Sequence, residues 1–193
     1  MDQSLYETQE YNGYNTNIYY DGDPQHPRKE FDNIGTLYTR HRSMQPEEDF
    51  GKHFEIEEVF AKQDYDFTNH FKKKYIAHRV YMYDHSGQTV STSPFSCRWD
   101  SALLGIIAVS IADVKKEYGW KNITKRRREK IEEYLQGEVE TFDDYLTGSV
   151  YGFTITDDQD NEIDSCWGYY GNDSIEEIKK ECMAIIDNIK VAA

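Results

Sequence analysis

Two cysteine-containing segments carry the residue types that nucleophilic catalysis requires. Cys97 lies within residues 95–101, close to an arginine and an aspartate, and His85 occupies a predicted turn nearby. Cys166 lies directly before Trp167. A cysteine with a histidine base and an aspartate can attack a carbonyl, but a small cysteine beside a tryptophan is more often a packing residue. We therefore predict no catalytic residue and keep a small cysteine-dependent hydrolase as an alternative function.

Carboxylates suggest a different chemistry, the imitation of nucleic-acid phosphates. Residues 131–193 hold 16 acidic and 3 basic residues, a net charge of −13. Rows of carboxylates on rigid elements can resemble a duplex, which carries about one charge per 1.7 Å of its axis. The alternative is a solvated face that only keeps the protein soluble. The predicted partner-binding acidic face consists of Glu132, Glu133, Glu138, Glu140, Asp143, Asp144, Asp158, Asp160, Glu162 and Asp164.

A basic run precedes the acidic segment and offers an alternative nucleic-acid-binding site. It consists of Lys125, Arg126, Arg127, Arg128 and Lys130, at the start of a predicted helix. Cations at a helix N-terminus oppose the helix macrodipole, so their presence there favours contact with phosphates or with an acidic partner. The alternative is pairing within the helix, such as Arg128 with a glutamate four residues on.

Metal and cofactor motifs are weak or missing. The pattern from Asp158 through Asp160 to Glu162 resembles the opening of a calcium loop, but the central glycine is missing and Tyr169 replaces the final glutamate. The three cysteines are too widely spaced for a paired-cysteine zinc site. Phosphate-loop, dinucleotide-binding and kinase patterns are also absent from the sequence. We predict no metal site and no cofactor.

Composition favours a folded, intracellular protein. The chain has 193 residues, of which 38% are hydrophobic and 15% aromatic, enough for a core. Residues 1–60 carry a net charge of −8 and residues 61–130 one of +7, so a basic middle lies between acidic ends. The start of the chain lacks an apolar signal segment, and the longest apolar run, residues 102–109, is too short to cross a bilayer. The odd number of cysteines favours a reducing cytoplasm.

The hydrophobic periodicity predicts the elements that position these residues. We expect a flexible N-terminal arm over residues 1–17 and a single α+β domain over residues 18–193. Alternating patterns predict strands that include residues 75–83, 150–156 and 162–170, and a buried strand over residues 103–109. A period of 3.6 residues predicts a long helix over about residues 125–146. A shorter helix is expected before it, with Ser110 as its N-cap and Gly119 at its end. The fold class is α+β, a mostly antiparallel β-sheet with three to four helices packed on one face.

Several blocks of the sequence together resemble an uncharacterised protein family common in bacteriophages and other mobile elements. The resemblance covers residues 18–172 and is most distinctive in its Trp-Asp-Ser and Ser-Cys-Trp-Gly segments. It implies a phage-encoded protein that acts inside a bacterial host, and small acidic proteins of that kind resemble inhibitors of host defence. No catalytic residue is carried over. The blocks are Tyr19-Tyr20-Asp21-Gly22-Asp23-Pro24, Asp32-Asn33-Ile34-Gly35-Thr36, Tyr83-Asp84-His85-Ser86-Gly87, Phe95-Ser96-Cys97-Arg98-Trp99-Asp100-Ser101, Glu117-Tyr118-Gly119-Trp120 and Asp164-Ser165-Cys166-Trp167-Gly168.

Together these observations predict a non-enzymatic, phage-encoded acidic inhibitor of a host nucleic-acid-targeting defence system, of the CRISPR or restriction type. It would bind the basic nucleic-acid groove of a host defence protein by charge mimicry, in the cytoplasm of the bacterial cell and without membrane contact. The main alternative is an accessory protein that binds nucleic acid through its basic central segment. Homodimer formation is left open.

Overall fold

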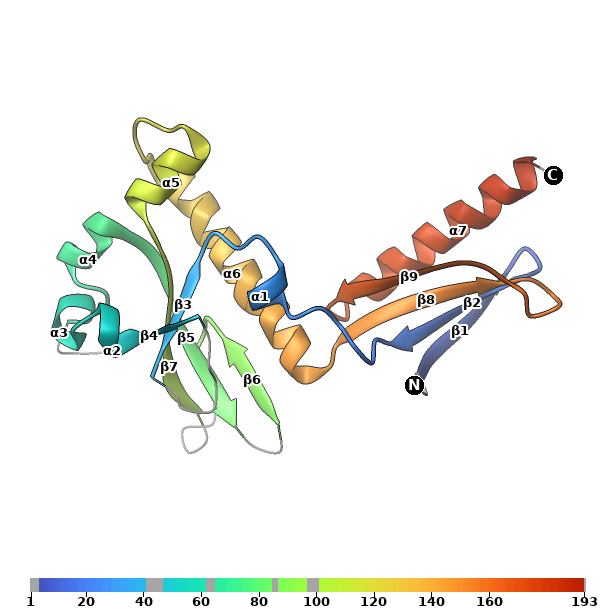
Figure 1. The fold of residues 1–193 in the computed structure, drawn as a ribbon, viewed down its shortest axis with the longest axis horizontal. Coiled ribbons are helices and arrows are strands. Elements are labelled where there is room, and N and C mark those ends of the chain that lie inside the picture. The colour runs from blue at the N-terminus through green and yellow to red at the C-terminus, as the bar shows by residue number, and fades with distance from the viewer. Residues whose placement is uncertain (1–3, 41–46, 62–64, 85–86, 97–100, 193) are drawn as a thin grey trace. The chain divides into compact units, whose positions relative to one another are not determined.

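The chain folds into two compact units. The computed structural model describes residues 4–40, 47–61, 65–84, 87–96 and 101–192. Unit 1 combines Met1–His26 with Asp144–Ala193, and unit 2 is Pro27–Asp143. Each unit has its own sheet, and all strand pairs but one within these residues are antiparallel (Figure 1). The predicted α+β class with mostly antiparallel sheets is confirmed, but the strands form two sheets and the chain forms two units where we expected one.

Unit 1 is a four-stranded antiparallel sheet with one long helix. The strand order is β1-β2-β8-β9, and β1 joins β2 through Asn12 and Gly13, whose φ angles of 55° and 85° are typical of a tight hairpin turn. The N-terminal segment therefore contributes two paired strands to this sheet, where we expected a flexible arm over residues 1–17. The elements are β1 (Leu5–Tyr11), β2 (Tyr14–Tyr20), β8 (Val150–Thr156), β9 (Glu162–Tyr170) and α7 (Ser174–Ala192).

One face of this sheet packs against α7. Alternate residues of the central strands, among them Ile18 and Phe153, point to the helix and join its buried isoleucines in one core. The opposite face carries Trp167, whose indole lies over Gly152: a Cβ at that position would lie 2.1 Å from the ring. The core residues of unit 1 are Ile18, Tyr151, Phe153, Ile155, Ile175, Ile178, Cys182 and Ile186.

Unit 2 is built on a five-stranded sheet in the order β4-β3-β7-β5-β6. The predicted buried strand is confirmed as β7, the middle strand of this sheet. The predicted long helix is confirmed as α6, which continues past the end of unit 2. The elements are α1 (Pro27–Glu30), β3 (Thr36–Thr39), β4 (Glu48–Asp49), α2 (Phe50–His53), α3 (Ile56–Val59), α4 (Asn69–Lys74), β5 (Tyr75–Asp84), β6 (Gln88–Ser91), β7 (Ser101–Ser110), α5 (Ile111–Tyr118) and α6 (Lys125–Thr147).

Helices cover both faces of the unit 2 sheet. On one face α6 packs its buried stripe, which includes Leu135, close to Ile107 of β7. On the other face the short helices α2, α3 and α4 contribute an aromatic cluster around Ile106 and Ala108, the neighbouring positions of β7. Residues that alternate along β7 therefore serve two cores, which explains its continuous apolar run. We expected helices on one face only.

The predicted helix boundaries of α5 are confirmed. Ser110 accepts a hydrogen bond from the Asp113 amide at 3.0 Å, and Gly119 ends the helix with a φ of 63°. None of the helices within the described ranges is long and apolar enough to cross a membrane.

Candidate functional site

The net charge of the chain resides almost entirely in unit 1. Unit 1 contains 16 acidic and 3 basic residues, a net charge of −13, whereas unit 2 contains 20 and 19, a net charge of −1. Five of the 16 acids come from the N-terminal segment and eleven from the C-terminal segment. The sheet brings these segments together because β2 pairs with β8. Unit 1 is thus an acidic body built from both ends of the chain.

Few cations are available within unit 1 to neutralise this charge. Lys179 forms ion pairs with Glu7 at 2.9 Å and with Glu176 at 3.3 Å. The hydrogen bond that Lys179 donates to the Glu7 carboxylate is the main cause of the raised pKa of Lys179. The two other cations of the unit are Lys180 and Lys190. Three cations can offset only a small part of the charge of 16 carboxylates.

The turn between β8 and β9 presents exposed carboxylates from a well-defined backbone. Asp157 accepts hydrogen bonds from the Asn161 side chain at 2.9 Å, the Asn161 amide at 2.9 Å and the Gln159 amide at 2.8 Å. These bonds, with the Asn161 side chain first, lower the pKa of Asp157. Asp158 and Asp160 are exposed, and Asp160 has a left-handed φ of 61°. The Asp157 carboxylate therefore holds the turn, while its acidic neighbours face solvent.

The predicted one-sided row in this hairpin differs from the observed geometry. We expected the acidic residues at 158, 160, 162 and 164, which lie two apart, to project to one side of the hairpin. The first two lie in the turn, and β9 begins at Glu162, as predicted. Glu162 pairs with Thr156 and Asp164 pairs with Ile155, across a register shift. Thr156 and Ile155 are adjacent in β8, so their partners lie on opposite faces of the sheet. All four carboxylates are nevertheless exposed.

The described residues contain no group of three or more histidine, cysteine, aspartate or glutamate side chains placed to hold a metal ion. The calcium-like pattern after Asp158 therefore forms an acidic turn.

Two members of the predicted acidic face, Glu138 and Asp143, are held by hydrogen bonds to other elements of unit 2. Glu138 accepts hydrogen bonds from the Ile34 amide and from the Arg28 guanidinium, both at 2.7 Å. Asp143 accepts from the Thr89 hydroxyl at 2.5 Å, and from the next amide of β6 at 2.7 Å. Both carboxylates tie α6 to the rest of unit 2, so they are not part of an outward acidic surface. This corrects the sequence prediction for these positions.

The other predicted acids lie in varied surroundings. Glu132 approaches Arg128 at 3.9 Å, which agrees with pairing within the helix. Glu140 accepts a hydrogen bond from a glutamine side chain one turn earlier, at 2.8 Å, and Glu133 is exposed. Asp144 belongs to unit 1. The ten predicted residues are thus divided equally between the two units.

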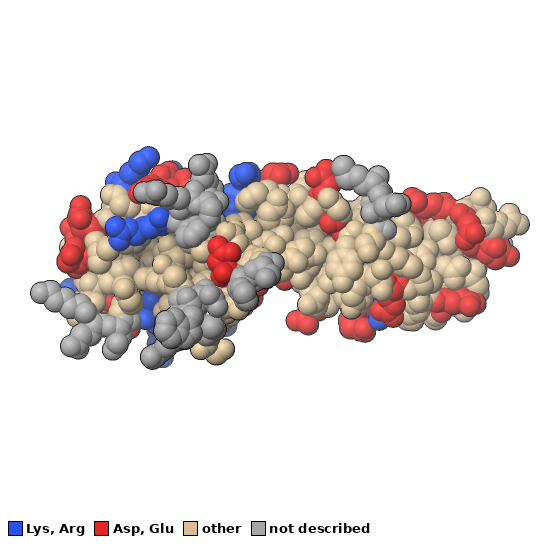
Figure 2. Space-filling view, turned by 90° about the horizontal axis from the view of Figure 1, so that it is seen from below, with Lys and Arg blue, Asp and Glu red and all other residues tan. Residues whose placement is uncertain are grey.

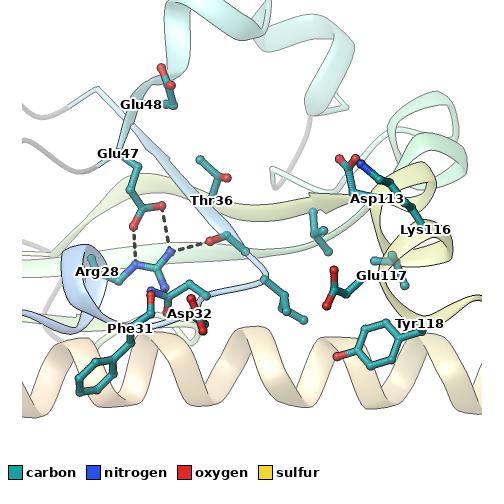
Figure 3. Close-up of a pocket in the computed structure, with 15 residues that line it drawn as sticks. Arg28, Phe31, Asp32, Thr36, Glu47, Glu48, Asp113, Lys116, Glu117 and Tyr118 are labelled. Carbon is teal, nitrogen blue, oxygen red and sulfur yellow. Dashed lines mark hydrogen bonds and ion pairs between the residues drawn. The ribbon is translucent and has the colours of Figure 1, made fainter.

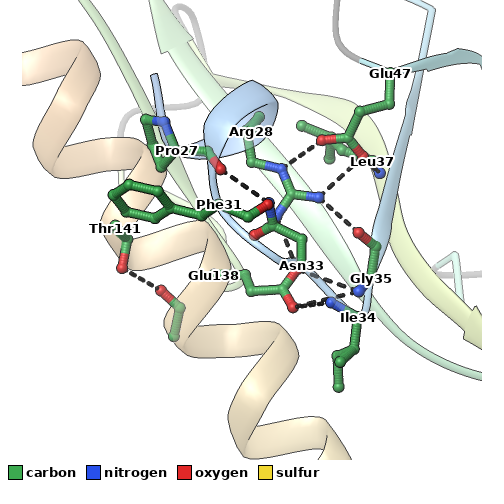
Figure 4. Close-up of polar contacts among 11 residues, drawn as sticks. Pro27, Arg28, Phe31, Asn33, Ile34, Gly35, Leu37, Glu47, Glu138 and Thr141 are labelled. Atoms are coloured by element: carbon green, nitrogen blue, oxygen red, sulfur yellow. Dashed lines mark hydrogen bonds and ion pairs between the residues drawn. The ribbon is translucent and has the colours of Figure 1, made fainter. Parts of the chain in front are cut away.

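Arg28 is the centre of a buried polar network that the sequence did not reveal (Figure 4). Its guanidinium is bound by both oxygens of Glu47, at 2.5 and 2.9 Å, and by Glu138. The remaining donors reach the Asn33 side chain at 2.9 Å and the Gly35 carbonyl at 2.6 Å. All five N–H groups therefore have an acceptor. Burial alone would lower the pKa of Arg28, but the hydrogen bond and charge of Glu47, followed by those of Glu138, raise it.

A polar cavity of about 910 Å³ lies beside this network (Figure 3). Arg28 lines it but has no donor left for a bound anion. The remaining charged groups are mostly acidic, and the described lining residues include no serine, cysteine or histidine that could act as a nucleophile or base. Besides Arg28 and Glu47, the charged and aromatic lining residues labelled in Figure 3 are Phe31, Asp32, Glu48, Asp113, Lys116, Glu117 and Tyr118.

Of the two candidate catalytic cysteines, the structure describes only Cys166. Cys97 and His85 lie outside the described residues. Cys166 is exposed on β9, whereas Cys182 is buried in the core of unit 1. Burial raises the pKa of the Cys182 thiol to about 11, which disfavours a nucleophilic thiolate. The position of Cys182 is that of a packing residue.

In the basic run at the start of α6, two arginines donate hydrogen bonds to backbone carbonyls and the other side chains are exposed. Arg128 donates to the carbonyls of Lys72 at 2.9 Å and Tyr75 at 3.2 Å, so it anchors α6 to the junction of α4 and β5. Arg127 donates to a loop carbonyl at 2.9 Å. Lys125, Arg126 and Lys130 are exposed, although Lys125 approaches Glu129 at 3.7 Å and Lys130 lies over the ring of Tyr134.

No protein-family model matches the chain, and comparison with curated proteins and with solved structures likewise finds no match.

Proposed function

We propose that the chain is an acidic inhibitor that places unit 1 in the basic, nucleic-acid-binding groove of a partner protein. The partner class we propose is a host defence protein that acts on nucleic acid, which is the context implied by the phage-family resemblance. The observation that carries the proposal is the segregation of charge, with −13 in unit 1 and −1 in unit 2. An acidic unit and a basic groove have complementary electrostatic potentials, which guide association and disfavour wrong partners.

The charge density of unit 1 is comparable to that of a duplex. Thirteen duplex phosphates occupy about 22 Å of helix axis. The nine residues of β9 span about 30 Å, and the nineteen residues of α7 about 28 Å. Unit 1 therefore carries a similar number of charges over a similar length, which supports competition for a groove shaped for nucleic acid.

The scaffold of unit 1 favours binding because its carboxylates extend from packed elements. Figure 2 shows acidic side chains at several places along the outline of unit 1, around an area without charged side chains. The exposed turn acids extend from a backbone held by Asp157. Charges that are fixed before association lose less conformational entropy on binding than charges on a disordered tail.

The test is capture from bacterial host lysate with the purified chain, followed by competition with DNA. We expect the captured protein to bind nucleic acid when alone, to lose that binding when the chain is added, and to dissociate from the chain steeply as salt increases. A complex that is insensitive to salt, or a captured protein that binds the chain and DNA together, would contradict the proposal.

A matched pair of variants separates local acidity from total charge. Asp158→Asn, Asp160→Asn and Glu162→Gln remove three exposed charges of unit 1, two in the β8–β9 turn and one at the start of β9. Neutralising three such charges should weaken the complex by about 0.6–3 kcal/mol, because exposed charge pairs contribute about 0.2–1 kcal/mol each. The control removes the same charge from exposed residues of unit 2 and should leave the affinity within about twofold. It combines Glu55→Gln, Glu57→Gln and Glu58→Gln.

A further inference from the structure

A second charged surface, of opposite sign, lies at the start of α6 within unit 2. We call it the basic–aromatic surface. It combines the end of α5, the loop that follows and the first turns of α6. All of its residues belong to unit 2, so it is independent of the acidic surface of unit 1. Its members are Tyr118, Trp120, Lys121, Lys125, Arg126, Arg127, Lys130 and Tyr134.

Rings and cations interleave on this surface. Tyr118 stacks on Trp120 with ring centroids 4.6 Å apart and an interplanar angle of 25°. The Arg127 guanidinium lies 4.7 Å from the Trp120 ring centroid. Lys130 lies 5.3 Å from the ring centroid of Tyr134, a side chain that is 41% exposed. Cation–π contacts hold the cations beside the rings without cancelling their charge.

The charge of this segment opposes the charge of the chain. Residues 115–130 contain eight lysines and arginines and two glutamates, a net charge of +6 in a chain of net charge −14. The Lys125 side chain is 91% exposed. Lys125, Arg126 and Arg127 also occupy the first turn of α6, the positive end of the helix dipole, where cations are unfavourable. A bound anion would relieve this local repulsion.

We propose that the basic–aromatic surface binds single-stranded nucleic acid. Its phosphates would contact Lys125, Arg126 and Lys130, and an unpaired base would stack on the exposed ring of Tyr134. Proteins that bind single strands combine a cationic track with aromatic rings in this way, whereas duplex bases are unavailable for stacking. An acidic peptide would use the cations but would gain nothing from the rings.

The test measures binding of the full chain to a fluorescein-labelled dT₁₂ oligonucleotide by anisotropy, from 50 to 200 mM salt. Tyr134→Leu should weaken binding about 5-fold or more, because loss of base stacking costs that much at the low end of measured values. The double variant Lys125→Gln, Arg126→Gln should make the slope of log affinity against log salt shallower by about 1.4, which is two phosphate contacts on a single strand.

The control variant removes two exposed cations of unit 2 that lie outside the surface. Lys29→Gln with Lys52→Gln should change neither the affinity nor the salt slope. Circular dichroism of each variant verifies that it is folded. Because the assay contains no partner protein, its result is independent of the inhibitor proposal.

Three results would overturn the proposal. The first is no binding of dT₁₂ at 50 mM salt, where phosphate contacts are strong. The second is equal affinity for dT₁₂ and for an abasic strand of the same length, since the rings would then contribute nothing. The third is equal competition by polyglutamate at matched charge, which would assign the surface to an acidic protein partner.

Discussion

The Arg28 network offers the sharpest test of how unit 2 is held together. Arg28 is 6% exposed and joins α1 to the chain before β3 and, through Glu138, to α6. Replacing it by methionine keeps an apolar chain of similar length but removes all five hydrogen bonds. The Glu47 and Glu138 side chains, 25% and 14% exposed, would then lose their cation.

The expected cost of Arg28→Met is about 3–5 kcal/mol, because removing one partner leaves the other charges uncompensated in a partly buried site. Glu138 keeps its hydrogen bond from the Ile34 amide, and Glu47 keeps one from the Leu37 amide at 2.6 Å. These bonds place the cost in the lower half of that range. A typical domain has a free energy of unfolding of about 5–15 kcal/mol, so the variant would be folded but markedly weakened.

Urea unfolding measures the total loss, and hydrogen exchange followed by mass spectrometry locates it. We expect faster amide exchange in β3 and around Gly35, with exchange in β8 and β9 of unit 1 unchanged. Adding Glu47→Gln and Glu138→Gln to Arg28→Met should recover part of the loss, because the uncompensated charges disappear. Lys29→Met, an exposed neighbour in α1, should cost less than about 0.5 kcal/mol.

A loss below about 1 kcal/mol for Arg28→Met would refute the reasoning. So would a further loss on neutralising the two glutamates, because both results would mean that the guanidinium is not the group that compensates them.

Two further predictions concern unit 1. Gly152→Ala places a methyl group 2.1 Å from the Trp167 ring. It should lower the free energy of unfolding by about 1–3 kcal/mol and shift the tryptophan emission, and an unchanged melting temperature would contradict the packing. The control Gly22→Ala, with open space around the glycine, should change neither quantity. Exposed Cys166 should react with a thiol reagent in the native protein at pH 8, and buried Cys182 only after unfolding. Equal labelling rates for the two thiols would disprove this assignment. Burial raises the pKa of Cys182 to about 11 in the folded protein. The contribution of the buried neutral thiol to the free energy of unfolding is therefore fully present below about pH 9 and is lost as the pH rises toward 11.

Local structure was largely determined by the sequence alone. The 3.6-residue period around Ile131 and Leu135 predicted α6, and both residues are fully buried. The continuous apolar run of β7 predicted a buried strand, and Ser110 and Gly119 predicted the ends of α5. These features depend on neighbours within about four residues, so periodicity and capping are sufficient to reveal them.

Only the tertiary structure decided which carboxylates face solvent and which segments share a unit. Glu138 and Glu140 both lie off the buried stripe of α6, but Glu138 meets Arg28, 110 residues earlier in the chain. The N-terminal strands join the C-terminal ones where β2 pairs with β8, for example Ile18 with Phe153. This pairing brings into one unit the acidic residues that lie at the two ends of the sequence. The helical period specifies the direction in which a side chain points from the helix axis, and the strand pattern specifies the face on which it lies. Neither specifies the neighbouring group or the partner strand, because these depend on contacts between residues distant in sequence.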